Sequence, residues 1–371
     1  MTEAATFICG QCGEEHPLEQ CCMVGEEELC ERCAQEETLL CIRCGTRIWR
    51  EGNAGDTDTP LCQQCYDRFY TSCECCGRLI RNDDVCYEDD DEDYPLCSSC
   101  LTRRASGRII QDNCYKPEPI FYGAGQRFFG VELEIDGAGE SAEKAKRFLE
   151  LANGDGFERL YCKHDGSLDD GLELVTHPMT LSCHRQEMPW RELLAAAARM
   201  GYLSHKANTC GLHIHVNRSA FGETEDKQEA AIARVLYFFE KNWEELLKFS
   251  RRTQRQLERW AARYGYKEQP RDILEHAKKG YYGGRYACVN LTNRDTIEFR
   301  MFRGTLKYNT LMAALQLVDR VCDAALFLSD QEMKELSWTT FAAGCTESEL
   351  VQYLKERRLY VNEPVESEVE L

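Results

Sequence analysis

Pairs of cysteines recur with a fixed period in the first 100 residues, and this feature constrains the chain most. Each pair has the form Cys-x-x-Cys, and the pairs begin at Cys9, Cys30, Cys41, Cys62, Cys73 and Cys97. Successive repeats start 32 residues apart, and 17, 17 and 20 residues separate the two pairs of each repeat. Two intervening residues let both thiolates reach one tetrahedral Zn²⁺, and a second pair completes its shell. The spacing therefore predicts three small zinc modules.

The predicted zinc ligands are the twelve paired cysteines: Cys9, Cys12, Cys30, Cys33, Cys41, Cys44, Cys62, Cys65, Cys73, Cys76, Cys97 and Cys100. The pattern resembles treble-clef or LIM-like fingers. Pairing across repeats stays open, because only 7 residues separate Cys33 from Cys41. His16 could replace a cysteine, but the twelve paired cysteines already fill three shells. A disulfide or redox-active dithiol framework is the alternative to metal. Four thiolates leave no open position for catalysis, so we expect three structural Zn²⁺ ions and an adaptor-like role.

Charge also distinguishes this region, since residues 1–100 carry 7 Lys and Arg against 23 Asp and Glu in a chain of net charge −19. Affinity for a phosphate backbone comes largely from Lys and Arg, so we expect no nucleic acid as the main partner. The longest apolar stretch, near residues 193–198, is far shorter than the roughly 20 residues that span a bilayer. The N-terminus lacks a signal-peptide pattern. These features predict no membrane partner and a reducing, cytoplasmic location.

Three regions follow from the composition: zinc modules over residues 1–110, a linker over 111–126 and a larger domain over 127–371. In the larger domain, period-two alternation predicts strands over 128–136, 171–177, 211–217, 285–291 and 296–302. Helical periodicity predicts helices over 141–153, 185–200, 226–249, 251–264, 309–328 and 347–357. This mixture indicates an α+β fold.

Polar side chains share one face on several of these strands. Residues i and i+2 of a strand project to the same side, which pairs Glu132 with Glu134, His213 with His215, and Glu298 with Arg300; Glu173 lies on a fourth strand. The ordinary explanation for each pair alone is the wet face of an antiparallel sheet. Together they would crowd several charges unless a cation and an anion bound among them. Carboxylate ligands favour Mg²⁺ or Mn²⁺, and the arginine favours a phosphate.

These motifs carry a family resemblance over residues 127 to about 325. The segments 130–134, 165–178, 208–215 and 297–305 are similar, in this order, to the motifs of the amidoligase family, a branch of the glutamine synthetase-like carboxylate-amine ligases. The resemblance implies an antiparallel glutamine synthetase-like catalytic sheet with helices. It also implies ATP-dependent formation of an amide through an acyl phosphate, with ATP and Mg²⁺ (or Mn²⁺) as cofactors.

Site residues are carried over from the same resemblance. It implies Glu134, Glu173 and Asp165 around one metal ion, and Glu132, His213 and Glu298 around a second. Arg300 would hold phosphate, and His215 and Asn208 would face the acid substrate or the acyl phosphate. Asp165 stands where glutamine synthetase has Glu, which shortens its reach.

Two weaker features are basic. Arg251, Arg255, Arg259 and Arg263 would form a stripe on one helical face, which either pairs with internal acids such as Glu258 and Glu268 or binds an anion. Arg285 follows two glycines, in either a phosphate-binding loop or a simple turn. We therefore take Arg251 and Arg285, with Arg300, as candidate ATP-binding residues.

The function expected from the sequence is an amide-forming ligase whose zinc region docks a substrate or partner. The acid and the amine could each be a metabolite, a protein or a peptide. One alternative is a zinc-finger adaptor whose second domain binds nucleotide without turnover, and another is a metallohydrolase. The set of four glutamates with Arg300 argues against both alternatives.

Overall fold

The computed structural model describes residues 6–25, 27–74, 76–87, 94–105, 109–113, 115–279 and 286–360. The chain divides into two compact units, one comprising residues 1–106 and 114–117, the other residues 107–113 and 118–371. No helix in the described part of the chain is both long and apolar enough to cross a membrane.

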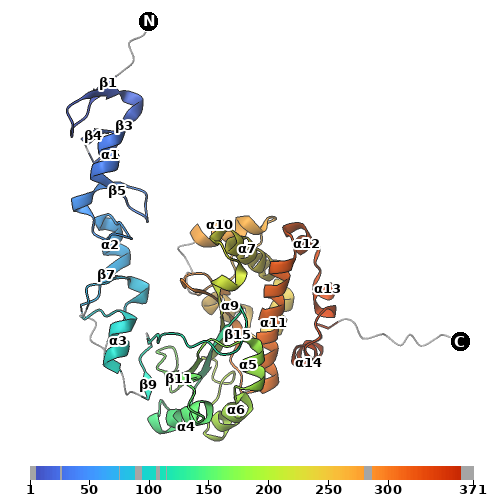
Figure 1. Cartoon of the computed structure of the whole chain (residues 1–371). Coiled ribbons are helices and arrows are strands. Elements are labelled where there is room, and N and C mark those ends of the chain that lie inside the picture. Colours follow the sequence, from blue (N-terminus) through green and yellow to red (C-terminus); the bar gives the residue numbers. More distant parts are fainter. Residues whose placement is uncertain are drawn as a thin grey trace, which may run out of the picture. The chain divides into compact units, whose positions relative to one another are not determined.

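The smaller unit consists of three consecutive modules, each with a knuckle hairpin followed by a short helix (Figure 1). The first contains β1 Thr6–Ile8, β2 Glu15–Pro17, η1 Leu18–Gln20, β3 Cys21–Val24, β4 Glu27–Cys30 and α1 Glu31–Glu37. The second contains β5 Thr38–Leu40, β6 Arg47–Trp49, η2 Arg50–Gly52 and α2 Gln63–Phe69. The third contains β7 Tyr70–Ser72, β8 Leu79–Arg81, η3 Asn82–Asp84 and α3 Ser98–Ala105.

The same turn holds the first cysteine pair of each module. In module one the amide of Gly13 donates to the carbonyl of Cys9 at 2.8 Å, and Gly13 has φ of 72°. Gly45 and Gly77 repeat this bond and this left-handed φ at intervals of 32 residues. Only glycine adopts that conformation without steric cost, so the residue after each first pair is dictated by the turn.

A seven-stranded sheet organises the larger unit. Its order is β14-β15-β13-β10-β12-β11-β9, and every pairing is antiparallel except that between β11 and β9. The strands are β9 Ile110–Gln111, β10 Phe129–Ile135, β11 Leu160–Lys163, β12 Leu172–Thr176, β13 Gly211–Asn217, β14 Val289–Asn290 and β15 Thr296–Arg303. The sheet thus starts at residues that the sequence analysis assigned to the zinc region and the linker.

Helices fill the connections between these strands. They are α4 Ala142–Asn153, α5 Leu181–Gln186, α6 Trp190–Arg199, η4 Arg218–Phe221, α7 Glu225–Lys241, α8 Trp243–Ser250, α9 Gln254–Trp260, α10 Pro270–Lys279, α11 Tyr308–Phe327, α12 Asp330–Glu335, α13 Trp338–Ala343 and α14 Ser348–Glu356. The mixed α+β class and the mostly antiparallel sheet match the prediction.

Three predicted helices were wrong in extent. The helix over 185–200 is divided, because Pro189 caps α6 and cannot continue α5. The helix over 226–249 is divided at Asn242. The helix over 251–264 shrinks to α9, because Arg251 has φ of 59° and ends α8 there.

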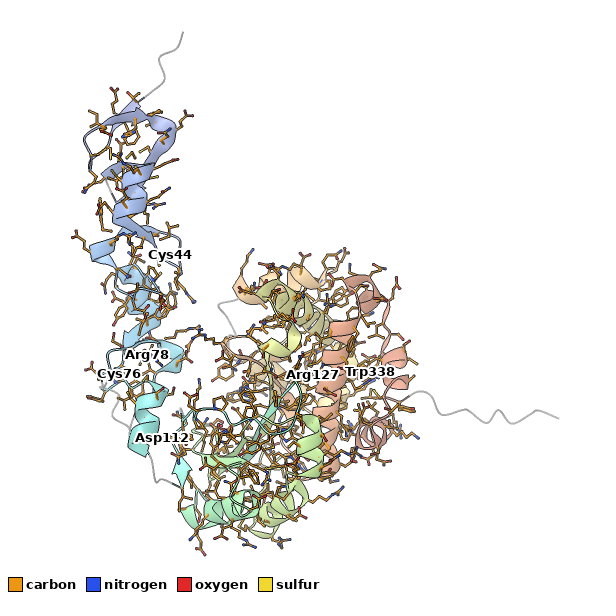
Figure 2. All side chains as sticks on the ribbon, in the orientation of Figure 1. Cys44, Cys76, Arg78, Asp112, Arg127 and Trp338 are labelled. Carbon is orange, nitrogen blue, oxygen red and sulfur yellow. The ribbon has the colours of Figure 1, made fainter. Side chains whose placement is uncertain are left out.

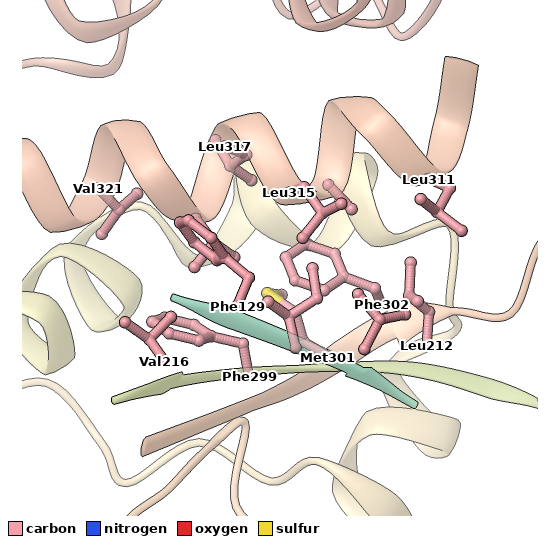
Figure 3. Packing of buried hydrophobic residues seen from close by; sticks show 14 of the residues in the cluster. Phe129, Leu212, Val216, Phe299, Met301, Phe302, Leu311, Leu315, Leu317 and Val321 are labelled. Atoms are coloured by element: carbon pink, nitrogen blue, oxygen red, sulfur yellow. The ribbon is translucent and has the colours of Figure 1, made fainter. Parts of the chain in front are cut away.

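The apolar face of the sheet packs against α11. Figure 3 shows Leu311, Leu315 and Val321 of this helix above side chains of β10, β13 and β15. α7 adds to the same core, with the rings of Phe239 and Phe299 at 5.4 Å between centroids. α14 packs against α11. The opposite face of these strands carries the polar residues.

Candidate metal and ligase site

Strand register aligns the acidic residues across the sheet. Glu134 of β10 lies directly opposite Glu173 of β12, which in turn lies opposite Lys163 of β11. Glu132 lies opposite His213, and His215 lies opposite Glu298. Directly opposite residues share a face, so five neighbouring strands, β15, β13, β10, β12 and β11, direct their charged groups to one side of the sheet.

His213 is the centre of this cluster. Its Nδ1 lies 3.4 Å from Glu132 Oε2 and 3.7 Å from Glu298 Oε1, and its Nε2 lies 3.7 Å from Glu134 Oε1. His215 Nε2 lies 3.2 Å from Glu132 Oε1. Ligand atoms of Glu132, Glu173 and His213 all lie within 4.8 Å of one another. These spacings suit a shared cation.

Burial and neighbouring charge separate the four glutamates into two kinds. Burial alone would raise the pKa of Glu132, but His215 and His213 outweigh it and hold that pKa well below its usual value. Glu298 is shifted the same way, because His215 and Arg300 outweigh burial. Burial raises the pKa of Glu134, and burial with the charge of Glu132 raises that of Glu173 well above its usual value. The last two carboxyls thus resist ionisation until a further cation offsets their charge.

The donor set fits divalent cations. Four carboxylates meet three permanent cations here, Lys163, Arg252 and Arg300. Lys163 Nζ lies 3.5 Å from Glu173 Oε2, and Arg300 Nη1 donates to Glu298 Oε1. The oxygen-rich donors favour a hard ion such as Mg²⁺ or Mn²⁺. The resemblance implied that Glu173 binds one ion and that Glu132 and His213 bind the other, but ligand atoms of all three lie within 4.8 Å of one another, so the two sets form one continuous cluster.

A family model described as "Putative amidoligase enzyme" matches residues 125–322, more than half of the chain. The chain belongs to the amidoligase family. The resemblance seen in the sequence is thereby confirmed, and membership indicates an enzyme of the ligase type. No curated protein matches the chain.

A β-bulge shapes the candidate site beside Arg300. The register between β13 and β15 shifts between Leu212 and Ile214, opposite the segment that contains Arg300. Bulges re-aim side chains and are frequent near active sites. Arg300 Nη1 donates a hydrogen bond to Glu298 Oε1, while the buried Nε of the same side chain has no hydrogen-bond partner in the described part of the chain. The guanidinium therefore retains a free donor.

Two predicted residues lie in the loops that flank the strands. Asp165 is partly buried, its Oδ1 accepts the amide of Ser167 at 2.8 Å, and its charge acts on Glu134 and Glu173. Asn208 is exposed and has φ of 67°. Asparagine tolerates this left-handed conformation better than most residues, which accounts for it without a catalytic role.

Asp136 holds both of these loops in place. Its carboxylate accepts hydrogen bonds from the amides of Asp169 at 3.1 Å and Asp170 at 2.7 Å, and from Thr209 Oγ1 at 2.6 Å. Burial opposes ionisation, but these donors outweigh it and lower the pKa of Asp136. A charged Asp136 therefore ties the Asp165 loop to the segment that enters β13.

The predicted arginine stripe does not exist as one helical face. Arg251 lies at the end of α8 and Arg263 lies beyond α9. Arg263 Nε donates to Glu240 Oε2 at 2.8 Å. An internal acid therefore pairs with this arginine, as one alternative expected, but the acid is Glu240 and not Glu258 or Glu268. Arg285 lies outside the described residues.

Sequence reasoning missed three residues of the cluster. Lys163 ends β11 one strand beyond the recognised motifs, and Arg252 belongs to no strand. Asn290 Nδ2 donates to Glu298 Oε2 at 2.7 Å. Lys163 could have been found because Tyr161 and Lys163 alternate with the apolar residues Leu160 and Cys162, as expected for a strand. No local pattern marks Arg252.

The zinc cysteines gather as three sets of four, each within one repeat. Cys9, Cys12, Cys30 and Cys33 form the first set, and the equivalent residues form the other two; the exposed Cys44 and Cys76 are labelled in Figure 2. The sets fit zinc-binding modules and favour pairing within repeats. Burial opposes ionisation of Cys9, but the amides of Cys12 and Cys30 outweigh it and lower its pKa to about 6. His16 Nε2 lies 3.7 Å from Cys12 Sγ.

Proposed function

We propose that the larger unit is an ATP-dependent carboxylate-amine ligase that forms an amide through an acyl phosphate. The observation that carries this proposal is the row of glutamates on β15, β10 and β12, with the two histidines of β13 between them and Arg300 beside them. Family membership supports the same reaction class. The glutamine synthetase-like arrangement of the sheet is part of the proposal.

Glu132, Glu134, Glu173, His213 and Glu298 would hold Mg²⁺ or Mn²⁺, with Asp165 at the edge of the set. When bound with ATP, these ions supply neutralising charge to the phosphate groups. The chain's own contribution is positioning, because strands fix these side chains more precisely than loops would. Arg300 would hold the transferring phosphoryl group through the donors that Glu298 leaves free.

His215 would face the acid substrate. Burial alone would lower its pKa, but Glu132 and Glu298 outweigh burial and raise it, which favours the positively charged imidazole. A charged imidazole beside the site attracts a carboxylate. Asn208 would lie nearer the entrance, consistent with its exposure.

The zinc modules would hold three structural Zn²⁺ ions and dock a protein substrate or partner in the cytoplasm. Four thiolates leave no coordination position for a reactant, so these modules would act through their surfaces. The free energy of zinc binding would drive the folding of each module, because such small units bury too little apolar surface to fold without the metal.

The test is product analysis with the purified full chain, ATP, Mg²⁺ and a pool of amino acids and polyamines. We expect ADP only when both a suitable acid and Mg²⁺ are present, and hydroxylamine should trap the acyl phosphate as a hydroxamate. If the protein bound ATP but formed no ADP with any acid and amine pool, the adaptor function would replace the ligase.

A further inference from the structure

A group of basic side chains lies at the end of the sheet where β13 begins and β15 ends. We call it the basic patch, and it consists of His205, Lys206, Arg251, Arg252, Arg303 and Lys307. Three segments far apart in sequence bring it together: the loop before β13, the end of α8, and the end of β15 with the residues that follow.

Specific contacts join these segments. Arg303 lies directly opposite Gly211 in the sheet. The amide of Gly304 donates to the carbonyl of Cys210 at 3.2 Å, and Ser204 Oγ donates to the carbonyl of Glu134 at 3.1 Å. At the end of α8, the ring of Phe249 packs on Phe302 at 5.9 Å between centroids. The backbone that carries the patch is therefore fixed by the sheet and by α8, and the patch adjoins the glutamate cluster.

The cations of the patch act on one another. Burial lowers the pKa of His205, and Arg303 and Arg251 lower it further. Burial and Arg251 lower the pKa of Arg303. Burial lowers the pKa of Arg252 to about 10, against the pull of Glu134, and Arg300 adds to this effect. Like charges that act on one another in this way oppose folding unless an anion lies among them.

Acids of the described chain do not form ion pairs with the side chains of the patch, although the protein has a net charge of −19. Other arginines of the same unit do have such partners. Arg127 pairs with Asp319 and Asp323, and Arg159 pairs with Asp155 at 2.7 Å. Apart from Arg252, which lies beside Glu134, the basic groups of the patch thus have no carboxylate partner among the described residues and remain available for a ligand.

Gly211 supports this view independently. A Cβ at this position would lie 2.6 Å from Arg252 Nη2 and 2.7 Å from His213 Nε2. Glycine weakens a strand, and it occurs where another group must approach the backbone closely. Here the glycine admits the Arg252 guanidinium to the polar face of the sheet, beside Glu134.

We propose that the basic patch binds a multiply charged oxyanion next to the glutamate cluster. Phosphates of a nucleotide and carboxylates of an acidic substrate share this chemistry. The role of such a ligand, as a reactant of the ligase, rests on the proposed function, whereas the binding itself does not depend on turnover. Arginine suits either ligand because its planar fork makes two parallel hydrogen bonds to an oxyanion.

The test measures binding without turnover, so its failure differs from failure of the ligase. Two probes, inorganic tripolyphosphate and a hexaglutamate peptide, are titrated calorimetrically into the metal-free full chain. The variant Arg303→Gln with Lys307→Gln should weaken binding of at least one probe about 10-fold at about 50 mM salt, and less at about 500 mM, because salt screens exposed charges. Competition by ATP against the bound probe identifies the nucleotide as the ligand; no competition identifies an acidic substrate.

The matched control removes the same two charges elsewhere, as Arg147→Gln with Lys227→Gln, because both side chains are exposed and pair with neighbouring acids. It should bind like the wild type. Arg251→Asn is a milder second variant, since asparagine tolerates the left-handed conformation found there, and it should weaken binding about 3-fold. The proposal is overturned if neither probe binds the wild type, or if the patch variants and the control bind equally.

Discussion

Glu134 and Glu173 lie directly opposite each other on β10 and β12, and both are buried. Like charges in opposed positions of a sheet destabilise it. Burial raises the pKa of both carboxyls, which partly relieves the repulsion in the absence of metal. An arrangement that costs stability in the free protein is explained if a cation binds between the two residues.

Replacing Glu134 with Gln tests this explanation. Glutamine can still accept the amide of Gly211, so the fold should persist, and without Mg²⁺ the melting temperature should equal or exceed that of the wild type. Metal-dependent turnover should fall by at least about 10 to 100-fold, the range seen when groups that support a metal site are removed. The stabilisation that Mg²⁺ or Mn²⁺ produces in thermal melts should shrink with it.

The matched control for this variant is Glu223→Gln, which removes one exposed carboxylate next to α7. It should retain the full metal-induced shift. An unchanged shift in Glu134→Gln would remove this residue from the metal site.

Gly211→Ala should impair the site by displacing neighbouring side chains, although the new methyl group itself would not contact the substrate. The new methyl group would collide with the ends of the Arg252 and His213 side chains, which can move, whereas the backbone of the strand need not. We expect a small change in melting temperature and a loss of turnover of about 100-fold, as misplacement by about 1 Å can cause. Gly156→Ala is unsuitable as a control because of its positive φ, but Gly52→Ala meets open space. Unimpaired turnover in Gly211→Ala would show that Arg252 does not need its present position.

His184 should make the larger unit sensitive to acid. Its Nε2 donates to the carbonyl of Phe129 at 2.9 Å and its Nδ1 accepts from Trp190 Nε1 at 3.3 Å, which leaves no acceptor for a second proton. Burial lowers its pKa to about 4, although the carbonyl of Phe129 favours the protonated form. Between pH 6.5 and 4 the unfolded chain binds a proton that the folded chain does not. The free energy of unfolding should therefore fall by about 1.4 kcal/mol per pH unit, or about 3 kcal/mol in total, as pH decreases through this window.

Urea unfolding followed by tryptophan fluorescence measures this, because four of the five tryptophans lie in the larger unit. His184→Gln should be less stable than the wild type at pH 7, yet lose less stability on acidification. Parallel pH profiles for the two proteins would assign the acid sensitivity to other groups.

Elemental analysis of the full chain should find three zinc ions. Cys30→Ser should lower the content to two and unfold mainly the first module, because the metal supplies its folding energy locally. Cys322→Ala, which removes a buried thiol of α11 outside the three sets, should keep all three ions. A wild-type content of two ions would contradict pairing within repeats, because pairs that bind across repeats complete only two four-cysteine shells.

Local patterns in the sequence determined the zinc modules and the strands of the site. The cysteine spacing and the glycine after each first pair act within a few residues of the chain, so both can be recognised from the sequence alone. The alternation around Glu132 and His213 likewise identifies strands β10 and β13 and their polar faces, because side-chain direction in a strand has period two. The edge strand β9 carries only two residues, too few for a pattern to form.

Tertiary structure alone decided which charges meet. Strand order places Lys163 opposite Glu173, and the end of α8 brings Arg252 to Gly211; no periodicity along the chain relates these residues. The predicted stripe that included Arg251 and Arg263 failed for the same reason, since the helix ends at a left-handed residue and Glu240 of α7 pairs with Arg263. Charge pairing depends on distances between segments remote in sequence, and packing of the whole core sets those distances.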